Sequence, residues 1–208
     1  MFPQLLPHAI RFLERSQTGR TALRAVRRWK SRPNRLRPKV LCIGNLKTGT
    51  SSFGVAMRRL GYSHFGFDYD MAHDWLPGNQ LNRCLSLAEH FDSFDDLPWS
   101  DPRLVHAFAR RFPNTRFVLL ERALPSWIVS WRRHFARLGQ PVMDTDEQLT
   151  RRYHDHNSRV LQAVSGYGEV LRMNVCAGEG YEVLCPFLQL PPLQEPFPKV
   201  NVQEGHKL

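Results

Sequence analysis

The segment of residues 39–61 constrains the fold of this chain more than any other part of the sequence. Residues 40–43 form a short apolar run, which is typical of a strand buried on both faces of a sheet. A turn with two glycines follows, and apolar residues then recur at helical spacing up to Gly61. This order places free backbone N–H groups and the positive end of a helix dipole at the turn, where they attract an anion. We therefore predict a phosphate-binding loop, with an ordinary turn carrying a solvated lysine as the alternative.

The residues of this turn do not fit the common nucleotide-binding patterns. The turn runs Lys47, Thr48, Gly49, Thr50, Ser51 and Ser52. A Walker A loop has its lysine directly after the second glycine, whereas Lys47 precedes Gly49 here. The G-x-G-x-x-G fingerprint of dinucleotide-binding domains is also absent. An ordinary P-loop nucleotide or small-molecule kinase is therefore a rival interpretation with little support, and the strand at 117–121 offers no Walker B aspartate for it.

Apolar runs and helical patterns alternate along the rest of the chain. Strands are predicted at 116–121 and 170–173, and a short one within 62–69. Helical patterns cover residues 81–90, 102–111, 125–138 and 146–165, and a shorter one covers 180–190. Residues 92–101 are acidic, and we assign no strand there. This alternation predicts an α/β three-layer sandwich, with a central parallel sheet and helices on both faces.

A second candidate anion site follows the strand at 116–121. Arg122 comes directly after this strand, at the edge of an open α/β sheet where ligands bind. Ser130 lies eight residues on, about two turns into the following helix. The two side chains could converge on one phosphate, with the arginine binding it through two nitrogens. Alternatively, Arg122 pairs with Glu121 or Asp144 and Ser130 bonds within its own helix.

The positive charge of the chain is concentrated at its N-terminus. Residues 1–39 contain 11 Lys and Arg and one acid, whereas the remaining 18 basic and 18 acidic residues cancel. Residues 8–31 have the pattern of one or two basic amphipathic helices, which either bind a polyanion or membrane surface or pack on the domain. We predict a basic N-terminal arm and linker at 1–38 and the main domain at 39–208. Peripheral membrane contact through residues 1–38 is one expectation, and no nucleic-acid partner is expected.

The cysteines and the hydropathy indicate a cytoplasmic protein. None of the four cysteines forms a CxxC pair, and no histidine cluster has zinc spacing. Cys42 falls inside the first strand and is predicted to be a buried thiol, while a bridge between Cys176 and Cys185 is left open. No apolar run is long enough to span a membrane, and no signal peptide is evident.

The two anion sites together resemble those of a known enzyme superfamily. Residues 47–52 resemble the 5′-phosphosulfate loop of sulfotransferases that use 3′-phosphoadenosine 5′-phosphosulfate (PAPS), and residues 117–130 resemble their 3′-phosphate motif. Further blocks resemble bacterial-type members, at 91–99, 111–117, 152–157, 176–188 and 196–198. The resemblance covers about residues 39–202. It implies a P-loop-like fold and transfer of a sulfuryl group from PAPS to a hydroxyl or amine, leaving adenosine 3′,5′-bisphosphate.

The resemblance also assigns roles to residues of this chain. Lys47 would stabilise the leaving oxygen, and the backbone of 48–52 with the Thr50, Ser51 and Ser52 hydroxyls would hold the 5′-phosphate. Arg122 and Ser130 would hold the 3′-phosphate, and no metal is required because the lysine and helix dipole supply the positive charge. The chain also departs from the family pattern. Ala123 stands where many members have Asp or Asn, and Phe53 lies one position after the expected adenine-stacking aromatic. The cationic segment that completes the 3′-phosphate site in cytosolic members is missing, and Lys199 is the candidate substitute for it.

The residue that accepts the proton is less well defined. Asp96 is the first choice, because Asp96, Leu97 and Pro98 lie where cytosolic members have His-Leu-Pro. His73 and Asp68, after the short strand, are the alternatives, and each of the three could instead be a surface polar group or helix cap. A small-molecule or glycan acceptor is expected. The last rival is a protein without catalytic activity that binds a polyanion or a membrane on a nucleotide-binding fold.

Overall fold

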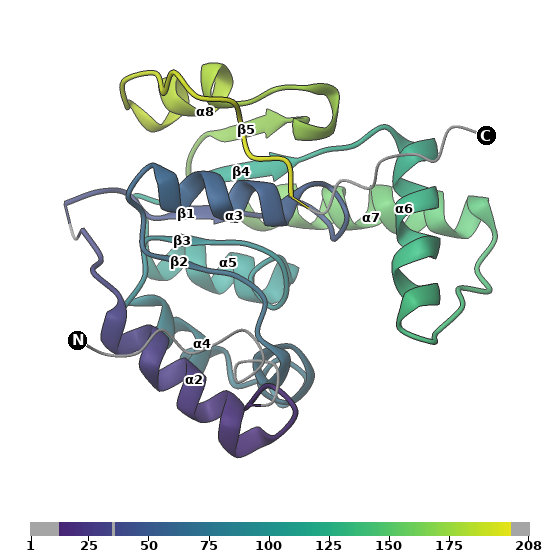
Figure 1. Cartoon of the computed structure of the whole chain (residues 1–208), viewed down its shortest axis with the longest axis horizontal. Helices are drawn as coiled ribbons and strands as arrows, with labels where there is room; N and C mark the ends of the chain where they lie inside the picture. The colour runs from purple at the N-terminus through teal and green to yellow at the C-terminus, as the bar shows by residue number, and fades with distance from the viewer. Residues whose placement is uncertain (1–12, 35, 201–208) are drawn as a thin grey trace.

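The computed structural model describes residues 13–34 and 36–200, and its centre is a five-stranded parallel sheet in the order β2-β3-β1-β4-β5 (Figure 1). The strands are β1 (Val40–Cys42), β2 (His64–Phe65), β3 (Ser93–Phe94), β4 (Arg116–Leu120) and β5 (Val170–Met173). Every neighbouring pair is parallel, and Leu41 of β1 lies opposite Phe94 on one side and Phe117 on the other. The predicted α/β class is confirmed.

Helices cover both faces of this sheet, because successive side chains of each strand point to opposite faces. Val40 and Cys42 pack with α3 (Thr50–Arg59) and α8 (Tyr181–Leu188). Leu41 and Ile43 pack in a larger cluster with α4 (Leu81–Ala88), α5 (Pro102–Arg111) and α7 (Asp146–Val164). The strands are apolar on both sides for this reason, and the predicted three-layer arrangement is confirmed.

Helix α6 (Leu124–Arg137) stands at one end of the molecule, away from α2 (Gln17–Lys30) and α4 (Figure 1). Its contact with α7 is a separate apolar cluster that contains Trp127, Trp131 and Tyr153. Two of these helices begin at side-chain caps that the sequence offers: Asp101 accepts from the N–H of Arg103 at α5, and Thr145 and Gln148 form a capping box at α7. Short one-turn helices, η1 (Met71–Trp75) and η2 (Val175–Ala177), complete the described elements.

Two strands differ from the sequence prediction. β2 lies within the predicted segment 62–69 but contains only His64 and Phe65, because the chain turns into η1 after Asp70. β3 was not predicted at all, although it lies between β2 and β1 near the middle of the sheet. Its two residues are followed by acidic ones, and so short a strand has no periodicity to detect.

The described part of the basic N-terminal segment is helix α2 (Gln17–Lys30), with Ser16 as its N-cap. Arg24 is buried and donates to both carboxylate oxygens of Asp68, at 2.9 and 2.8 Å, and to Asp70 at 2.8 Å. Arg20 also donates to Asp70, at 2.6 Å. Two arginines of this helix are therefore used in contacts with the domain. The expectation of a helix starting near residue 8 falls partly outside the described residues.

All four cysteines are free, so the bridge left open between Cys176 and Cys185 does not form. Cys42 is buried in β1, as predicted. Within residues 13–34 and 36–200, no helix has both the length and the apolar character needed to cross a membrane.

Candidate functional site

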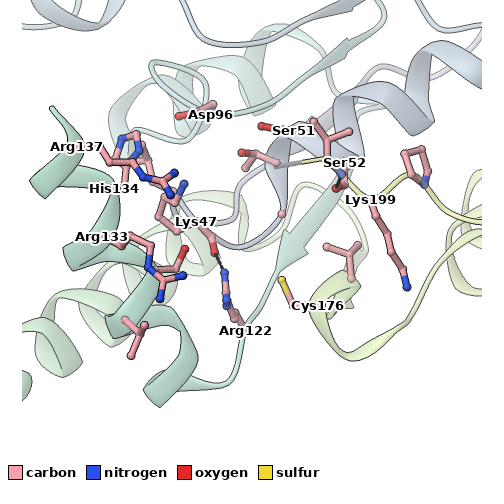
Figure 2. Close-up of a pocket in the computed structure, with 18 residues that line it drawn as sticks. Lys47, Ser51, Ser52, Asp96, Arg122, Arg133, His134, Arg137, Cys176 and Lys199 are labelled. Carbon is pink, nitrogen blue, oxygen red and sulfur yellow. Dashed lines mark hydrogen bonds between the residues drawn. The ribbon is translucent and has the colours of Figure 1, made fainter. Parts of the chain in front are cut away.

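A pocket of about 730 Å³ opens beyond the carboxyl ends of β1 and β4 (Figure 2). Its wall includes most of the residues predicted for the site: Lys47, Gly49, Thr50, Ser51, Ser52, Asp96, Arg122 and Ser130. Other members of the wall come from α6, from the turn around Cys176, and from residues 198–200. The two motifs that the sequence placed at separate points of the chain therefore share one cavity.

The glycine turn has the geometry of an anion-binding loop. Gly49 is the N-cap of α3, with φ of 109°, and no side chain caps the helix there. The first backbone bond of the helix runs from Phe53 N to Gly49 O at 3.0 Å, so the N–H groups before it have no acceptor within the helix and can face an anion. A Cβ at Gly49 would lie 2.1 Å from Val175 Cγ2, so only glycine fits. Thr48 is fully buried, and its hydroxyl donates to Asn45 O at 2.6 Å, which closes the loop and leaves only its backbone for a ligand.

Lys47 lies in this loop with a left-handed backbone, at φ of 69°. For a residue other than glycine this conformation is uncommon and costs about 1 kcal/mol, so packing around the loop must hold it. Trp127 contributes by donating to Leu46 O at 2.8 Å. Burial lowers the pKa of Lys47, the charges of Arg122 and Arg137 lower it further, and Asp96 opposes them. A bound anion beside Lys47 would therefore stabilise the charged form of its side chain.

Arg122 is positioned by neighbours on both sides. Its Nε donates to Ser126 Oγ at 3.0 Å, and its Nη1 donates to Lys47 O at 3.1 Å (Figure 2). Neither Glu121 nor Asp144 pairs with it, because Glu121 binds Arg172 and Asp144 binds Arg152. The guanidinium keeps further N–H groups for a ligand, and Ser130 lies on the same pocket wall. Ser126 was not identified from the sequence.

The backbone at Arg122 is held by the hydroxyl of Tyr153, on α7. This hydroxyl accepts from Arg122 N at 2.9 Å and donates to Arg122 O at 3.1 Å. The turn is therefore fixed although Ala123 replaces the usual Asp or Asn. His156 acts similarly one turn further on, with its Nε2 3.0 Å from Ile43 O, and orders α7 against the end of β1.

Asp96 is the candidate base that the structure brings into the pocket. Its side chain is half-buried and accepts from Leu97 N at 2.7 Å, and its φ of 61° is left-handed like that of Lys47. Burial raises the pKa of Asp96 to about 6, and the charge of Asp95 adds to this, against the opposing effects of the Leu97 N–H, Lys47 and Thr50. A carboxylate with such a pKa is a better proton acceptor than an ordinary aspartate while remaining largely ionised at pH 7.

The two alternative bases lie outside the pocket wall. His73 is exposed on η1, where its ring packs on Tyr69 with 4.3 Å between ring centroids. Asp68 is buried, and both of its oxygens accept from Arg24. The carboxylate of Asp68 is therefore committed to an ion pair that holds α2.

Several wall residues were not identified from the sequence. Arg133, His134 and Arg137 extend the α6 side of the pocket beyond Ser130, and the signal that could have found them is their spacing of three, four and seven residues from it. On the opposite side Val200 N donates to Ser52 Oγ at 3.1 Å, and the neighbouring Lys199 lies in the wall. Phe53 is fully buried in the core and is not available to stack on an adenine.

A smaller pocket of about 440 Å³ adjoins the first, and the two share Ser51 and Val200. Its wall contains His64 and Asp95, with 3.4 Å between His64 Nε2 and Asp95 Oδ1. Asp95 therefore faces a different cavity from Asp96, although the two are adjacent in sequence.

The pocket belongs to a domain with a recognisable family, and the described residues provide no metal centre. In the part of the chain that the structure describes, no group of three or more His, Cys, Asp or Glu side chains is placed to hold a metal ion. A family model described as a sulfotransferase domain matches residues 39–145 and 137–206. Among curated proteins, the comparison finds no match.

Proposed function

The chain belongs to the sulfotransferase domain family, and from this premise we propose that it transfers a sulfuryl group from PAPS to a hydroxyl or amine of an acceptor. The observation that carries the proposal is the convergence of the glycine loop, Lys47, Arg122, Ser130 and Asp96 on one pocket of about 730 Å³. Two cationic anchors and one carboxylate in a cavity of this size suit a donor with two anionic ends and an acceptor that must lose a proton.

The residues present fit this donor. The uncapped N-terminus of α3 offers backbone N–H groups to a 5′-phosphate, and the hydroxyls of Thr50, Ser51 and Ser52 stand in the first turn. Arg122 and Ser130 offer a second anion site for the 3′-phosphate. When bound, PAPS supplies an activated sulfuryl group whose S–O bond to the 5′-phosphate breaks.

Lys47 stabilises the oxygen that leaves. As in phosphoryl transfer, an in-line displacement builds negative charge on the leaving oxygen, so a fixed cation there lowers the barrier. Lys47 is partly desolvated and held in a left-handed backbone, so it needs little reorganisation at the moment of reaction. The N–H groups at the start of α3 add to this stabilisation.

Asp96 takes the proton of the acceptor. Its carboxylate lies in the same wall as Lys47 and interacts electrostatically with it. Burial keeps its pKa near 6, so at pH 7 it is ionised and can accept a proton from the attacking hydroxyl. We propose a small-molecule or glycan acceptor, a metal-independent reaction and a cytoplasmic setting. Peripheral membrane contact through residues 1–38 remains an additional prediction.

The test is calorimetry with adenosine 3′,5′-bisphosphate in the absence of metal. Wild-type protein should bind, and Arg122→Ala should lose about 2 kcal/mol or more, equivalent to about 30-fold in Kd, because a charged hydrogen-bond partner is removed. Arg151→Ala is the matched control, since Arg151 is an exposed arginine of α7 outside the pocket wall. Its affinity should equal that of wild type.

Other outcomes point to the rivals. Binding of ATP with Mg²⁺ in place of the bisphosphate would favour a P-loop kinase. Binding of neither nucleotide would favour a protein that uses the fold only to bind a polyanion or membrane, and turnover of PAPS would then also be absent.

A further inference from the structure

One face of α6 carries more positive charge than the donor needs. Ser130, Arg133, His134 and Arg137 all line the pocket, and their spacing places them on a single helical stripe. With a rise of about 1.5 Å per residue, Arg137 lies about 10 Å further along the axis than Ser130. A phosphate held by Arg122 and Ser130 is therefore near one end of this stripe, and Arg137 is at the other.

The far end of the stripe is the end where the sulfuryl transfer would occur. Figure 2 shows His134 and Arg137 on the α6 side of Lys47, toward Asp96, whereas Arg133 lies nearer to Arg122. The electrostatics agree with this placement, because the charge of Arg137 lowers the pKa of both Lys47 and His134, and the charge of Lys47 lowers the pKa of His134. Burial lowers the pKa of His134, with Lys47 and Arg137 adding to the effect, so its ring is neutral at pH 7 and can both donate and accept a hydrogen bond.

Arg137 differs from its neighbours in having no carboxylate partner among the described residues. On the outer side of α6, Arg132 pairs with Asp146 at 2.7 Å, and on α7 Arg152 pairs with Asp144 at 2.8 Å. These two arginines are neutralised locally. The positive charge of Arg137 is instead directed to the pocket, where Asp96 is the one acidic residue among the described residues of the wall.

An acceptor with a negative group would need such a cation. It would approach a donor that carries charge on both its sulfonate and its phosphates, and the repulsion between them would weaken binding unless a fixed positive group lies beside the acceptor. The planar fork of an arginine suits a carboxylate, sulfate or phosphate, because it can donate two parallel hydrogen bonds. A neutral hydroxyl acceptor would make no use of this fork.

We propose that Arg137 and His134 form an acceptor subsite that selects compounds carrying an anionic group beside the reacting hydroxyl. This inference rests on the proposed sulfotransferase function. In the reaction a bond forms between sulfur and the acceptor oxygen, the bond between sulfur and the bridging oxygen breaks, the proton goes to Asp96, and the bisphosphate leaves with the electron pair. Arg137 binds the anionic group and His134 bonds to the same group or to an adjacent hydroxyl.

The test measures binding to protein saturated with adenosine 3′,5′-bisphosphate, so it does not depend on turnover. The probes are two pairs matched in shape: 4-hydroxyphenylacetate against 4-hydroxyphenylacetamide, and galacturonic acid against galactose. At least one anionic probe should bind tenfold or more tightly than its neutral partner. Arg137→Ala should remove this preference, Arg137→Lys should keep part of it, and Arg151→Ala should keep all of it.

Three results would overturn the subsite. These are an absence of preference for the anion in both pairs, a preference that survives in Arg137→Ala, or a loss of bisphosphate affinity in Arg137→Ala, which would place Arg137 at the donor. A failure of the proposed function gives a different result, because wild-type protein would then not bind the bisphosphate at all, and the subsite would fall with it.

Discussion

The cations of α2 and the cations of the pocket differ in what they contact. Arg24 is buried between two carboxylates, Asp68 and Asp70, and Arg20 pairs with Asp70. In the pocket, Arg122 donates to a hydroxyl and a carbonyl, and neither it nor Lys47 forms a salt bridge with a described residue. The excess charge of residues 1–39 is thus partly neutralised within the fold, whereas the pocket keeps its charge for a ligand. Net charge along the sequence therefore does not by itself locate an anion site.

The largest effect is expected on stability, for the arginine of α2 that pairs with buried carboxylates. Arg24→Ala should lower the free energy of unfolding by about 3–5 kcal/mol, because it leaves Asp68 buried without its cation and Asp70 with Arg20 alone. Urea denaturation at pH 7 measures the loss. Arg28→Ala, on the exposed face of the same helix, should change stability by less than about 0.5 kcal/mol. A loss of under 1 kcal/mol in Arg24→Ala would show that α2 is not held by this ion pair.

For Lys47 we expect a loss of activity without a loss of stability. Lys47→Ala should reduce turnover of PAPS by about 10²–10³-fold, equivalent to about 3–4 kcal/mol, since it removes the charge at the leaving oxygen. Stability should not fall, because Lys47 makes no ion pair with a described residue and its side chain loses water on folding. Product formation is followed as release of adenosine 3′,5′-bisphosphate, and unfolding by urea. A variant with full turnover would remove Lys47 from the mechanism.

Asp96 contrasts with the carboxylates that hold α2, because it lies in the pocket and pairs with no arginine among the described residues. Its pKa is about 6 in the folded protein against an ordinary 3.8, so the folded state binds more protons than the unfolded state between these values. Stability is therefore lost as pH rises from about 4 to 6, and the full penalty applies above 6. Asp96→Asn should be more stable than wild type by about 1–2 kcal/mol at pH 8, and the gain should vanish below pH 4.

The same variant gives a kinetic test. In wild type, kcat/KM should rise with pH through about 6 and then level off, because the ionised carboxylate accepts the proton. Asp96→Asn should be slow and should lack this rise. If the rise persists in the variant, another group, such as His134, is the base.

The features predicted from the sequence are those set by local patterns. The apolar run before Gly44 and the helical spacing after Gly49 predicted β1, the loop and α3, because each depends on residues close in the chain. The eight-residue spacing placed Arg122 and Ser130 on one wall for the same reason.

The features that were missed depend on partners far away in the sequence. β3 follows Asp92, whose carboxylate accepts from the N–H groups of Asn34 and Ser63, and neither contact leaves a local signal. The sequence around Asp68 indicates only an acidic loop residue, because its partner Arg24 lies 44 residues earlier in the chain. The spacing of His134 and Arg137 is visible in the sequence, but their place in the pocket wall depends on how α6 is oriented relative to Lys47.

The smallest expected effect concerns how the pocket holds Arg122 without a carboxylate. Tyr153→Phe removes one hydroxyl that serves both the N–H and the C=O of Arg122. Stability should fall by about 1 kcal/mol, and bisphosphate affinity should fall by about threefold to tenfold because the guanidinium is less well positioned. Tyr167→Phe, whose ring packs on His106 outside the pocket wall, is the matched control and should leave affinity unchanged. Unchanged affinity in Tyr153→Phe would mean that Ser126 and the Lys47 carbonyl are enough to orient Arg122.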